Sequence, residues 1–250
     1  MTDYAELIEM LVPAVREAGA RIMEIHAHGV AASSKADGSP VTEADEAAEK
    51  ILLAALEKTA PKITVISEEN AESHLLEAGE QFFLVDPLDG TKEFLKADGK
   101  GAFTVNIALV ENRVPVMGIV YAPALDRMFT GCKNKGAFED GNTLEVREIP
   151  AAGPVAVASA SHRDEATNQW LVNHGVDQTV SIGSSLKFCL VAAGEADVYP
   201  RFGPTMEWDT AAGDAVLRAA GGTVSNPDES PFLYAKPEYR NGAFVAKGKF

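Results

Sequence analysis

Residues 86–91 of this 250-residue chain read Asp86-Pro87-Leu88-Asp89-Gly90-Thr91 and follow the apolar run FFLV at positions 82–85. The apolar run predicts a buried strand that delivers Asp86 at its end. The proline stiffens the chain and the glycine permits a sharp turn, so Asp89 is expected on the same side as Asp86. Two carboxylates held together repel one another, and both ionise only when cations lie between them. Hard divalent cations prefer such oxygen ligands, and Mg²⁺ fits best.

The same stretch also has an ordinary explanation. A helix that begins near Thr91 would offer unpaired N–H groups to an anion, and metal ligands beside it would indicate phosphoryl chemistry. Asp-Pro and Asp-Gly are common turn dipeptides, however, so the hexapeptide alone leaves a plain turn and a functional site equally open. An EF-hand does not fit, because the spacing D-x-[DN]-x-[DN]-G is absent. A dehalogenase-like phosphatase would have two aspartates separated by one residue, not two.

Further acidic residues are candidate ligands. Glu68 and Glu69 follow a strand expected over residues 63–67. The alternative is that this acidic pair lies in a solvated loop and has no function. Asp45 lies three residues after the threonine that caps a helix expected over residues 42–58. A capping box explains Asp45 without any function.

The second part of the chain contributes two more candidates. Asp209 is expected in the first turn of a helix over residues 208–220, where it could merely complement the helix dipole. Its functional interpretation is a third metal carboxylate. The segment Gly183-Ser184-Ser185 lies between an expected strand and an expected helix, where it either caps the helix or lines a ligand pocket with hydroxyl groups.

The charge excludes several classes of protein. The chain carries 22 Lys plus Arg against 37 Asp plus Glu, a formal net charge of −15. Such an acidic chain is a poor binder of DNA or RNA and is unsuited to anionic membrane surfaces. We expect no membrane span and no secretory signal, because neither kind of apolar segment is present. Only two cysteines occur, so a cytoplasmic protein is expected, with peripheral membrane association left open.

The chain reads as two layered halves that form one unit of the α/β (α+β) class. A first helix is expected over residues 3–26, kinked or shortened by Pro13, and a loop over residues 28–40. The segment PAAGP at residues 150–154 marks a boundary. The expected halves are residues 1–150, with most candidate ligands, and residues 151–250, with Asp209 and the specificity residues.

Four motifs, in this order, resemble the inositol monophosphatase superfamily. They are Val41-Thr42-x-x-Asp45, Glu68-Glu69, Asp86-Pro-Leu-Asp-Gly-Thr91 and Trp208-Asp209-x-Ala-Ala-Gly213. The resemblance covers nearly the whole chain, from about residue 42 to residue 222. It implies a layered αβαβα sugar-phosphatase fold and a Mg²⁺-dependent, lithium-sensitive phosphomonoesterase with two or three Mg²⁺ ions per site.

Within the superfamily, three segments look most like the bacterial 3′(2′),5′-bisphosphate nucleotidases. They are DGTKEF at residues 89–94, SSLKFC at 184–189 and the stretch over 196–209. The implied substrate is adenosine 3′,5′-bisphosphate, split to AMP and phosphate, with a place in sulfur assimilation. The alternatives are an inositol or histidinol phosphate phosphatase of the same superfamily and, from another class, a non-catalytic acidic metal-binding protein.

The resemblance also implies a role for each matching residue. The metal ligands would be Glu68, Asp86, the Leu88 carbonyl, Asp89 and Asp209. Asp45 and Thr91 would activate the attacking water, and Gly90, Thr91 and Lys92 would bind the phosphate. Glu69 would orient the metal ligands without binding the first two ions itself, or it would bind a weaker third ion. Substrate specificity would come from Gly183, Ser184, Ser185, Lys187, Arg201 and Glu207, with His162 and Arg163 as further cations. Arg201 is the best candidate for the second phosphate, and a homodimer and a monomer both fit the superfamily.

Overall fold

A seven-stranded sheet in the order β3-β4-β5-β6-β7-β8-β9 organises the first half of the protein. The computed structural model describes every residue except 1–2, 30–31, 35–39, 97–100 and 160–163. The strands of this sheet are β3 (Thr64–Ser67), β4 (Gln81–Asp89), β5 (Thr104–Glu111), β6 (Val114–Ala122), β7 (Arg127–Cys132), β8 (Gly136–Glu139) and β9 (Asn142–Leu144). Only β3 and β4 pair in parallel, and the other neighbours are antiparallel.

A five-stranded sheet in the order β11-β10-β12-β16-β14 organises the second half. Its strands are β10 (Val155–Ser159), β11 (Gln178–Ile182), β12 (Val198–Arg201), β14 (Thr223–Ser225) and β16 (Phe244–Lys247). Two further pairs of short antiparallel strands complete the sheets: β1 (Ala32–Ser34) with β2 (Pro40–Thr42), and β13 (Thr205–Met206) with β15 (Arg240–Asn241).

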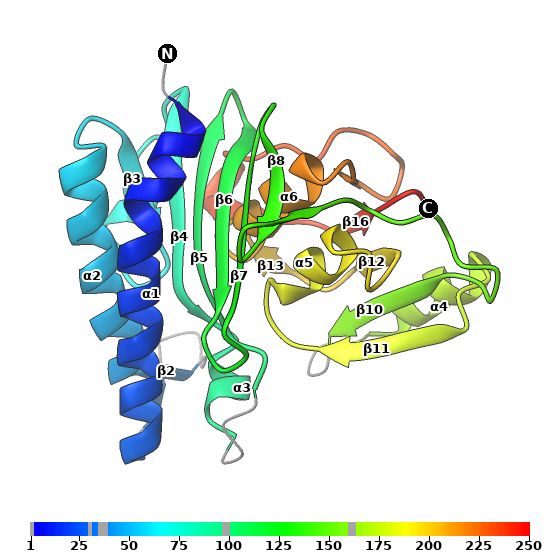
Figure 1. The fold of residues 1–250 in the computed structure, drawn as a ribbon, viewed down its shortest axis with the longest axis horizontal. Helices are drawn as coiled ribbons and strands as arrows, with labels where there is room; N and C mark the ends of the chain where they lie inside the picture. The colour runs from blue at the N-terminus through cyan, green and yellow to red at the C-terminus, as the bar shows by residue number, and fades with distance from the viewer. Residues whose placement is uncertain (1–2, 30–31, 35–39, 97–100, 160–163) are drawn as a thin grey trace.

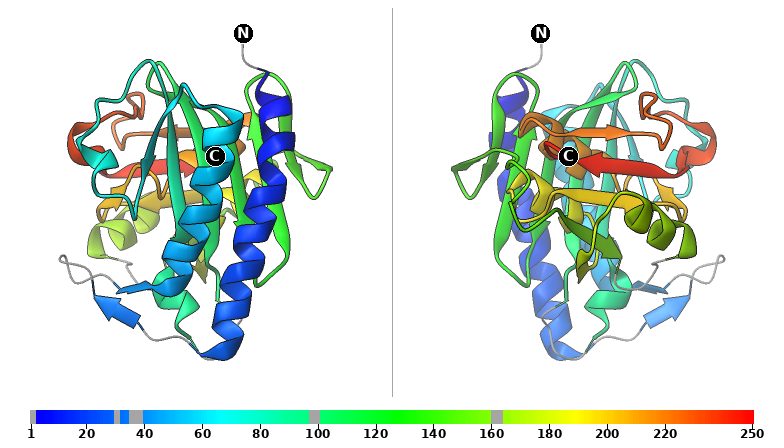
Figure 2. Two further views of the ribbon diagram at one scale, coloured as in Figure 1. Left: turned by 90° about the vertical axis from the view of Figure 1, so that its left-hand side faces the viewer. Right: turned by 90° about the vertical axis from the view of Figure 1, so that its right-hand side faces the viewer.

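The helices divide the molecule into layers. They are α1 (Tyr4–His28), α2 (Glu43–Thr59), α3 (Thr91–Phe94), α4 (Glu165–Asn173), α5 (Leu186–Ala192) and α6 (Ala211–Ala219), with 3₁₀ turns at Ser73–Leu75 and Pro237–Tyr239. Helices α1 and α2 run side by side across one face of the first sheet (Figures 1 and 2). Helices α5 and α6 lie between the two sheets, and α4 packs on the far face of the second sheet. This arrangement confirms the expected αβαβα fold.

The alternation of side chains along β4 decides which face carries Asp86. Phe83 and Val85 point into the apolar cluster under α1 and α2. Phe82 and Leu84 point into the other cluster, under α5 and α6. Successive strand residues face opposite sides of a sheet, so Asp86 follows Leu84 onto the face toward the second half. The register of one strand therefore directs this carboxylate into the interface between the halves.

Several expected boundaries are wrong. The segment expected as a loop over residues 28–40 contains the β1 strand, and the strand expected to end at residue 85 continues as β4 to Asp89. A change of register between Asp86 and Asp89 marks a bulge in β4, so both aspartates belong to this strand rather than to a free turn. Helix α1 continues through Pro13 from Tyr4 to His28.

Helix α6 packs so closely on the first sheet that glycine is required beneath it. A Cβ atom at Gly118 in β6 would lie 2.2 Å from the carbonyl oxygen of Ala212 and 2.9 Å from the Cβ atom of Ala215. Gly131 in the neighbouring β7 faces Val216 in the same way, at 2.8 Å from its Cα atom. The two glycines therefore set how near α6 can come to the first sheet.

This close approach gives a prediction about stability. We expect Gly118→Ala to lower the free energy of unfolding by about 3 kcal/mol, because either the helix or the sheet must shift to admit the methyl group. The matched control is Gly79→Ala, since Gly79 is exposed and its nearest contact would be an ordinary 3.7 Å. Urea unfolding of the two variants measures the difference. Equal stability of the two variants would show that the contact at Gly118 is not a constraint.

Candidate active site

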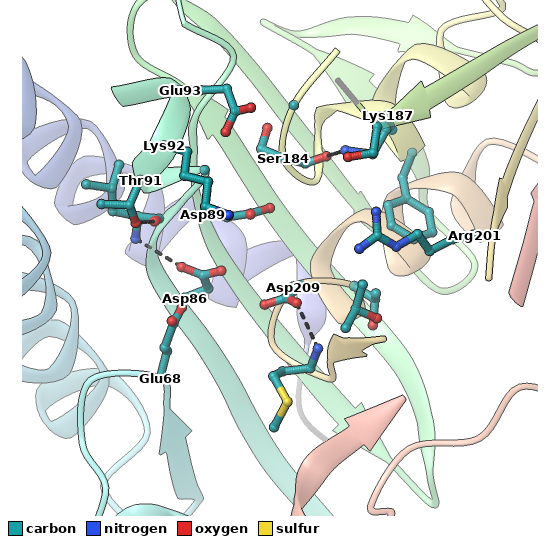
Figure 3. Close-up of a pocket in the computed structure, with 18 of the residues that line it drawn as sticks. Glu68, Asp86, Asp89, Thr91, Lys92, Glu93, Ser184, Lys187, Arg201 and Asp209 are labelled. Atoms are coloured by element: carbon teal, nitrogen blue, oxygen red, sulfur yellow. Dashed lines mark hydrogen bonds between the residues drawn. The ribbon is translucent and has the colours of Figure 1, made fainter. Parts of the chain in front are cut away.

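Three carboxylates from distant parts of the chain meet where the halves join. Glu68 directly follows β3, Asp86 lies in β4, and Asp209 precedes α6. One oxygen atom from each lies within 4.8 Å of the others (Figure 3). Asp86 is only 1 % exposed, whereas the other two are partly exposed toward a pocket.

The structure corrects the expected position of Asp209. Helix α6 begins at Ala211, and its N-cap is Thr210, so Asp209 lies before the helix rather than in its first turn. Its Oδ2 atom accepts a hydrogen bond from the backbone N–H of Met206 at 2.8 Å. This bond belongs to a turn, so the carboxylate is oriented by the turn and not by the helix dipole.

The electrostatics of the cluster favour a bound cation. Burial raises the pKa of the Asp86 carboxyl well above its usual range, and repulsion by Glu68 and the other nearby carboxylates raises it further. Burial also raises the pKa of Asp209, with repulsion by Asp89 as the next cause. The pKa of Asp89 is raised to about 6 by burial, against the opposing charge of Lys187. A cation among these groups would remove the repulsion.

The hydrogen bonding of Asp86 is a separate observation that fits a metal ligand. Its Oδ1 atom accepts the backbone N–H of Leu88 at 3.0 Å. Its Oδ2 atom is buried and accepts no hydrogen bond within the described part of the chain. A buried carboxylate oxygen without a partner is costly in a folded protein, and a hard divalent cation such as Mg²⁺ would satisfy it. The donor set therefore fits such an ion.

Asp45 caps a helix and also contacts a residue of the acidic motif. Its Oδ2 atom accepts the backbone N–H of Thr42 at 2.8 Å and its hydroxyl at 2.7 Å, so the capping box of α2 is present. Its Oδ1 atom lies 3.5 Å from the hydroxyl oxygen of Thr91. That hydroxyl is also 3.3 Å from the carbonyl oxygen of Leu88. The same carboxyl thus caps a helix and orients Thr91 beside the acidic motif.

Ser185 connects ligand candidates from the two halves. Its backbone N–H donates to the Oδ2 atom of Asp89 at 2.6 Å. Its hydroxyl lies 3.0 Å from the same oxygen and 2.5 Å from the carbonyl oxygen of Asp209. Ser185 is 1 % exposed and does not line the pocket, so its contacts position the carboxylates rather than a ligand.

A pocket of about 660 Å³ opens above the carboxylates. The lining residues that the sequence had singled out are Glu68, Asp86, Leu88, Asp89, Gly90, Thr91, Lys92, Gly183, Ser184, Lys187, Arg201 and Asp209. Asp45, Glu69, Ser185 and Glu207 are not part of the lining. His162 and Arg163 lie outside the described residues. The pocket therefore combines an acidic end with a wall that carries Lys and Arg.

Two cations of this wall are buried and held by backbone carbonyls. The Nζ atom of Lys187 donates to the carbonyl of Ser184 at 2.6 Å and lies 5.2 Å from the ring centroid of Tyr199. Burial lowers the pKa of Lys187 to about 8, against the opposing effect of Asp89. The guanidinium of Arg201 donates to the carbonyls of Gly203 and Pro204 at 3.1 and 3.2 Å. Both charged groups line the pocket, where an anionic ligand could bind them.

Glu207 has a different environment from the one expected of a specificity residue. It is completely buried, and its carboxylate accepts the backbone N–H groups of Ala235 and Lys236 at 2.8 and 2.9 Å. The ammonium of Lys236 lies 3.2 Å away. Glu207 therefore ties the turn before α6 to the segment that leads into β15, and it faces away from the pocket.

The sequence interpretation missed several lining residues. They are Glu93, Ser159, Phe188, Tyr199, Pro204, Thr205, Met206, Thr210 and Arg240. Side chains alternate between the two faces of β12, so the sequence pattern could have identified Tyr199 as a pocket residue. Arg240 was not, because β15 has only two residues and the segment before it has no regular periodicity.

Fold and pocket together define a phosphatase-like α/β protein with a carboxylate site suited to metal ions. The chain belongs to the inositol monophosphatase family, whose model matches residues 3–248. The 3′(2′),5′-bisphosphate nucleotidase CysQ of Escherichia coli O157:H7 is 43 % identical over 236 residues, which cover 93 % of this chain and 95 % of that protein. CysQ of Salmonella typhimurium is 46 % identical over 222 residues, 87 % of this chain and 89 % of that protein. The crystal structure of CysQ from Bacteroides thetaiotaomicron superposes with a TM-score of 0.84 at 36 % identity and covers 98 % of both chains.

Proposed function

We propose that this protein is a Mg²⁺-dependent phosphomonoester hydrolase, a 3′(2′),5′-bisphosphate nucleotidase that converts adenosine 3′,5′-bisphosphate to AMP and phosphate. The observation that carries the proposal is the pocket in which Glu68, Asp86 and Asp209 meet opposite the buried cations Lys187 and Arg201. The acidic end suits metal ions and the phosphate to be split, and the basic wall suits a second phosphate. The relatives named CysQ support this choice of substrate.

Five residues of the site would hold the metal ions. The first Mg²⁺ would be held by Glu68, Asp86 and the Leu88 carbonyl, and the second by Asp86, Asp89 and Asp209. When bound, the ions would polarise the phosphoryl group and make a water molecule more acidic. Glu69 would support this set or bind a weaker third ion.

Asp45 and Thr91 would orient the attacking water. The Thr91 hydroxyl can accept a proton from the water while it donates to the Oδ1 atom of Asp45, which lies 3.5 Å away. The backbone N–H groups of Gly90 and Thr91, at the start of α3, and the Lys92 side chain would bind the scissile phosphate. The water oxygen would then join phosphorus as its proton passes through the Thr91 hydroxyl to Asp45, the bond from phosphorus to the ribose oxygen would break, and that oxygen would take up a proton from solvent.

A substrate panel tests the proposal. Phosphate release with Mg²⁺ would be measured on adenosine 3′,5′-bisphosphate, 3′-phosphoadenylyl sulfate, inositol 1-phosphate and histidinol phosphate, with and without Li⁺. We expect the highest kcat/KM on adenosine 3′,5′-bisphosphate. A higher value on inositol 1-phosphate or histidinol phosphate would identify a different activity within the family. No release from any of them would favour a non-catalytic metal-binding protein.

The setting of the protein is a further part of the proposal. Among the described helices, none has the length and apolar character needed to cross a membrane. Cys132 and Cys189 are both buried free thiols, as is usual in a reducing compartment. We propose a cytoplasmic location on this basis. A homodimer, and folding of residues 1–150 and 151–250 as two halves, stay predictions.

A further inference from the structure

Arg240 is a pocket residue whose charged group has no protein partner. It is the first residue of β15, it is exposed, and it lines the pocket together with Lys187 and Arg201. Its guanidinium makes no hydrogen bond or ion pair with any residue that the structure describes. In this it differs from Lys187 and Arg201, whose charged groups donate to carbonyls. An unpaired arginine at the mouth of an anion pocket is free to bind a ligand.

The backbone beneath Arg240 is fixed. Arg240 pairs with Met206 in the two-stranded antiparallel sheet of β13 and β15. The next residue, Asn241, is 3 % exposed and donates to the carbonyl of Met206 at 2.8 Å and to the hydroxyl of Thr210 at 3.0 Å. Its Oδ1 atom accepts the ammonium of Lys236 at 2.9 Å. An exposed side chain on a backbone that is already fixed can bind a ligand while little backbone entropy is lost.

The same contacts relate Arg240 to the metal site. The backbone N–H of Met206 donates to Asp209, so the strand partner of Arg240 also orients a proposed ligand. The Arg240 guanidinium nevertheless forms no ion pair with a described carboxylate. The positive charge of Arg240 is therefore not neutralised by the carboxylates at the acidic end of the pocket. It is available to a ligand group that binds beside them.

We propose that Arg240 is a specificity-determining residue that binds the phosphate group of the substrate that is not hydrolysed. The inference rests on the proposed function, because it needs a substrate with two phosphates. The metal ions would neutralise the phosphate to be split, and the second phosphate would remain a dianion that needs its own cations. Arginine suits this task, since its planar fork can donate two parallel hydrogen bonds to a phosphate. Arg240 would bind this group together with Lys187 and Arg201, which line the same pocket.

The test compares two substrates that differ by one phosphate, adenosine 3′,5′-bisphosphate and adenosine 3′-monophosphate. For Arg240→Ala we expect the ratio of the two kcat/KM values to fall about tenfold or more, as is typical when a hydrogen bond between charged groups is lost. Arg240→Lys should recover part of the ratio, because it keeps the charge and loses the fork. The charge-matched control is Arg21→Ala, on an exposed residue of α1 that pairs with Glu24.

The outcomes separate this inference from the proposed function. A ratio in Arg240→Ala equal to that of the wild type, or an equal loss on both substrates, would overturn the role of Arg240. A fall of the same size in Arg21→Ala would also overturn it, since net charge alone would then explain the effect. A wild-type enzyme that does not prefer the bisphosphate would overturn the proposed function instead. Unchanged thermal unfolding of Arg240→Ala and Arg240→Lys would show that the fold is intact in both variants.

Discussion

Asp86→Asn is expected to lower Mg²⁺-dependent phosphate release by about a thousandfold or more, a loss of about 4 kcal/mol of transition-state stabilisation. Asp86 is the one carboxylate that would contact both ions, and an amide is a weak, neutral ligand in its place. Its buried Oδ2 atom, which accepts no hydrogen bond from the described residues, would lose its proposed metal contact. Steady-state kinetics with adenosine 3′,5′-bisphosphate measures the change.

The same substitution should not unfold the protein. Without metal, the Asp86 carboxylate is repelled by Glu68 and the other nearby carboxylates, so removal of its charge should make the metal-free variant at least as stable as the metal-free wild type. The matched control is Asp177→Asn, the same chemical change on an exposed residue of the second half. More than a tenth of wild-type activity in Asp86→Asn would contradict the two-metal assignment. An unfolded variant would contradict the account of the repulsion.

Removal of divalent metal is expected to destabilise the protein and to abolish substrate binding. A metal present at about a hundred times its Kd contributes about 2.7 kcal/mol to the free energy of unfolding. Glu68, Asp86, Asp89 and Asp209 carry four negative charges in the ionised state, which two Mg²⁺ ions balance. An anionic nucleotide would meet those charges uncompensated in EDTA. Calorimetric titration with inorganic phosphate, the product released at the metal end, with and without Mg²⁺, measures the loss, and tight binding in EDTA would contradict this role of the metal.

The pH dependence of the metal effect has a definite sign. Asp86, Asp89 and Asp209 have raised pKa values in the fold, that of Asp89 about 6 against an ordinary 3.8. The metal-free fold therefore binds more protons than the unfolded chain. The stability from Asp89 is fully present below about pH 4 and is lost as the pH rises through about 6. Bound Mg²⁺ would hold the carboxylates ionised and would offset this loss.

The gap in Tm between samples with Mg²⁺ and samples with EDTA should accordingly widen from pH 5 to pH 8. Differential scanning calorimetry at several pH values measures the gap. Asp86→Asn serves as the control, because it should narrow the gap at every pH. A gap that is constant or that shrinks with rising pH would contradict the proposed coupling between metal binding and the carboxylates.

Local signals in the sequence were reliable where a few neighbouring residues decide the structure. The capping box of Thr42 and Asp45 is present at the expected residues. Strands β7, β8 and β9 were not predicted, because short strands depend on pairing with neighbours distant in the chain. The N-terminal boundary of α6 was placed too early for a related reason, since the turn before it is held by contacts to β15 and the preceding segment.

The sequence by itself determined the αβαβα fold and the family, through the order and spacing of the four acidic motifs. Only the tertiary structure decided which side chains face the pocket. Glu207, adjacent to the Trp208-Asp209 pair, points away from the pocket toward Lys236, and Arg240, in no motif, points to the pocket. The reason is physical. Residue type and spacing specify what a side chain can bind, but its direction depends on strand register and on turns fixed by contacts between distant segments.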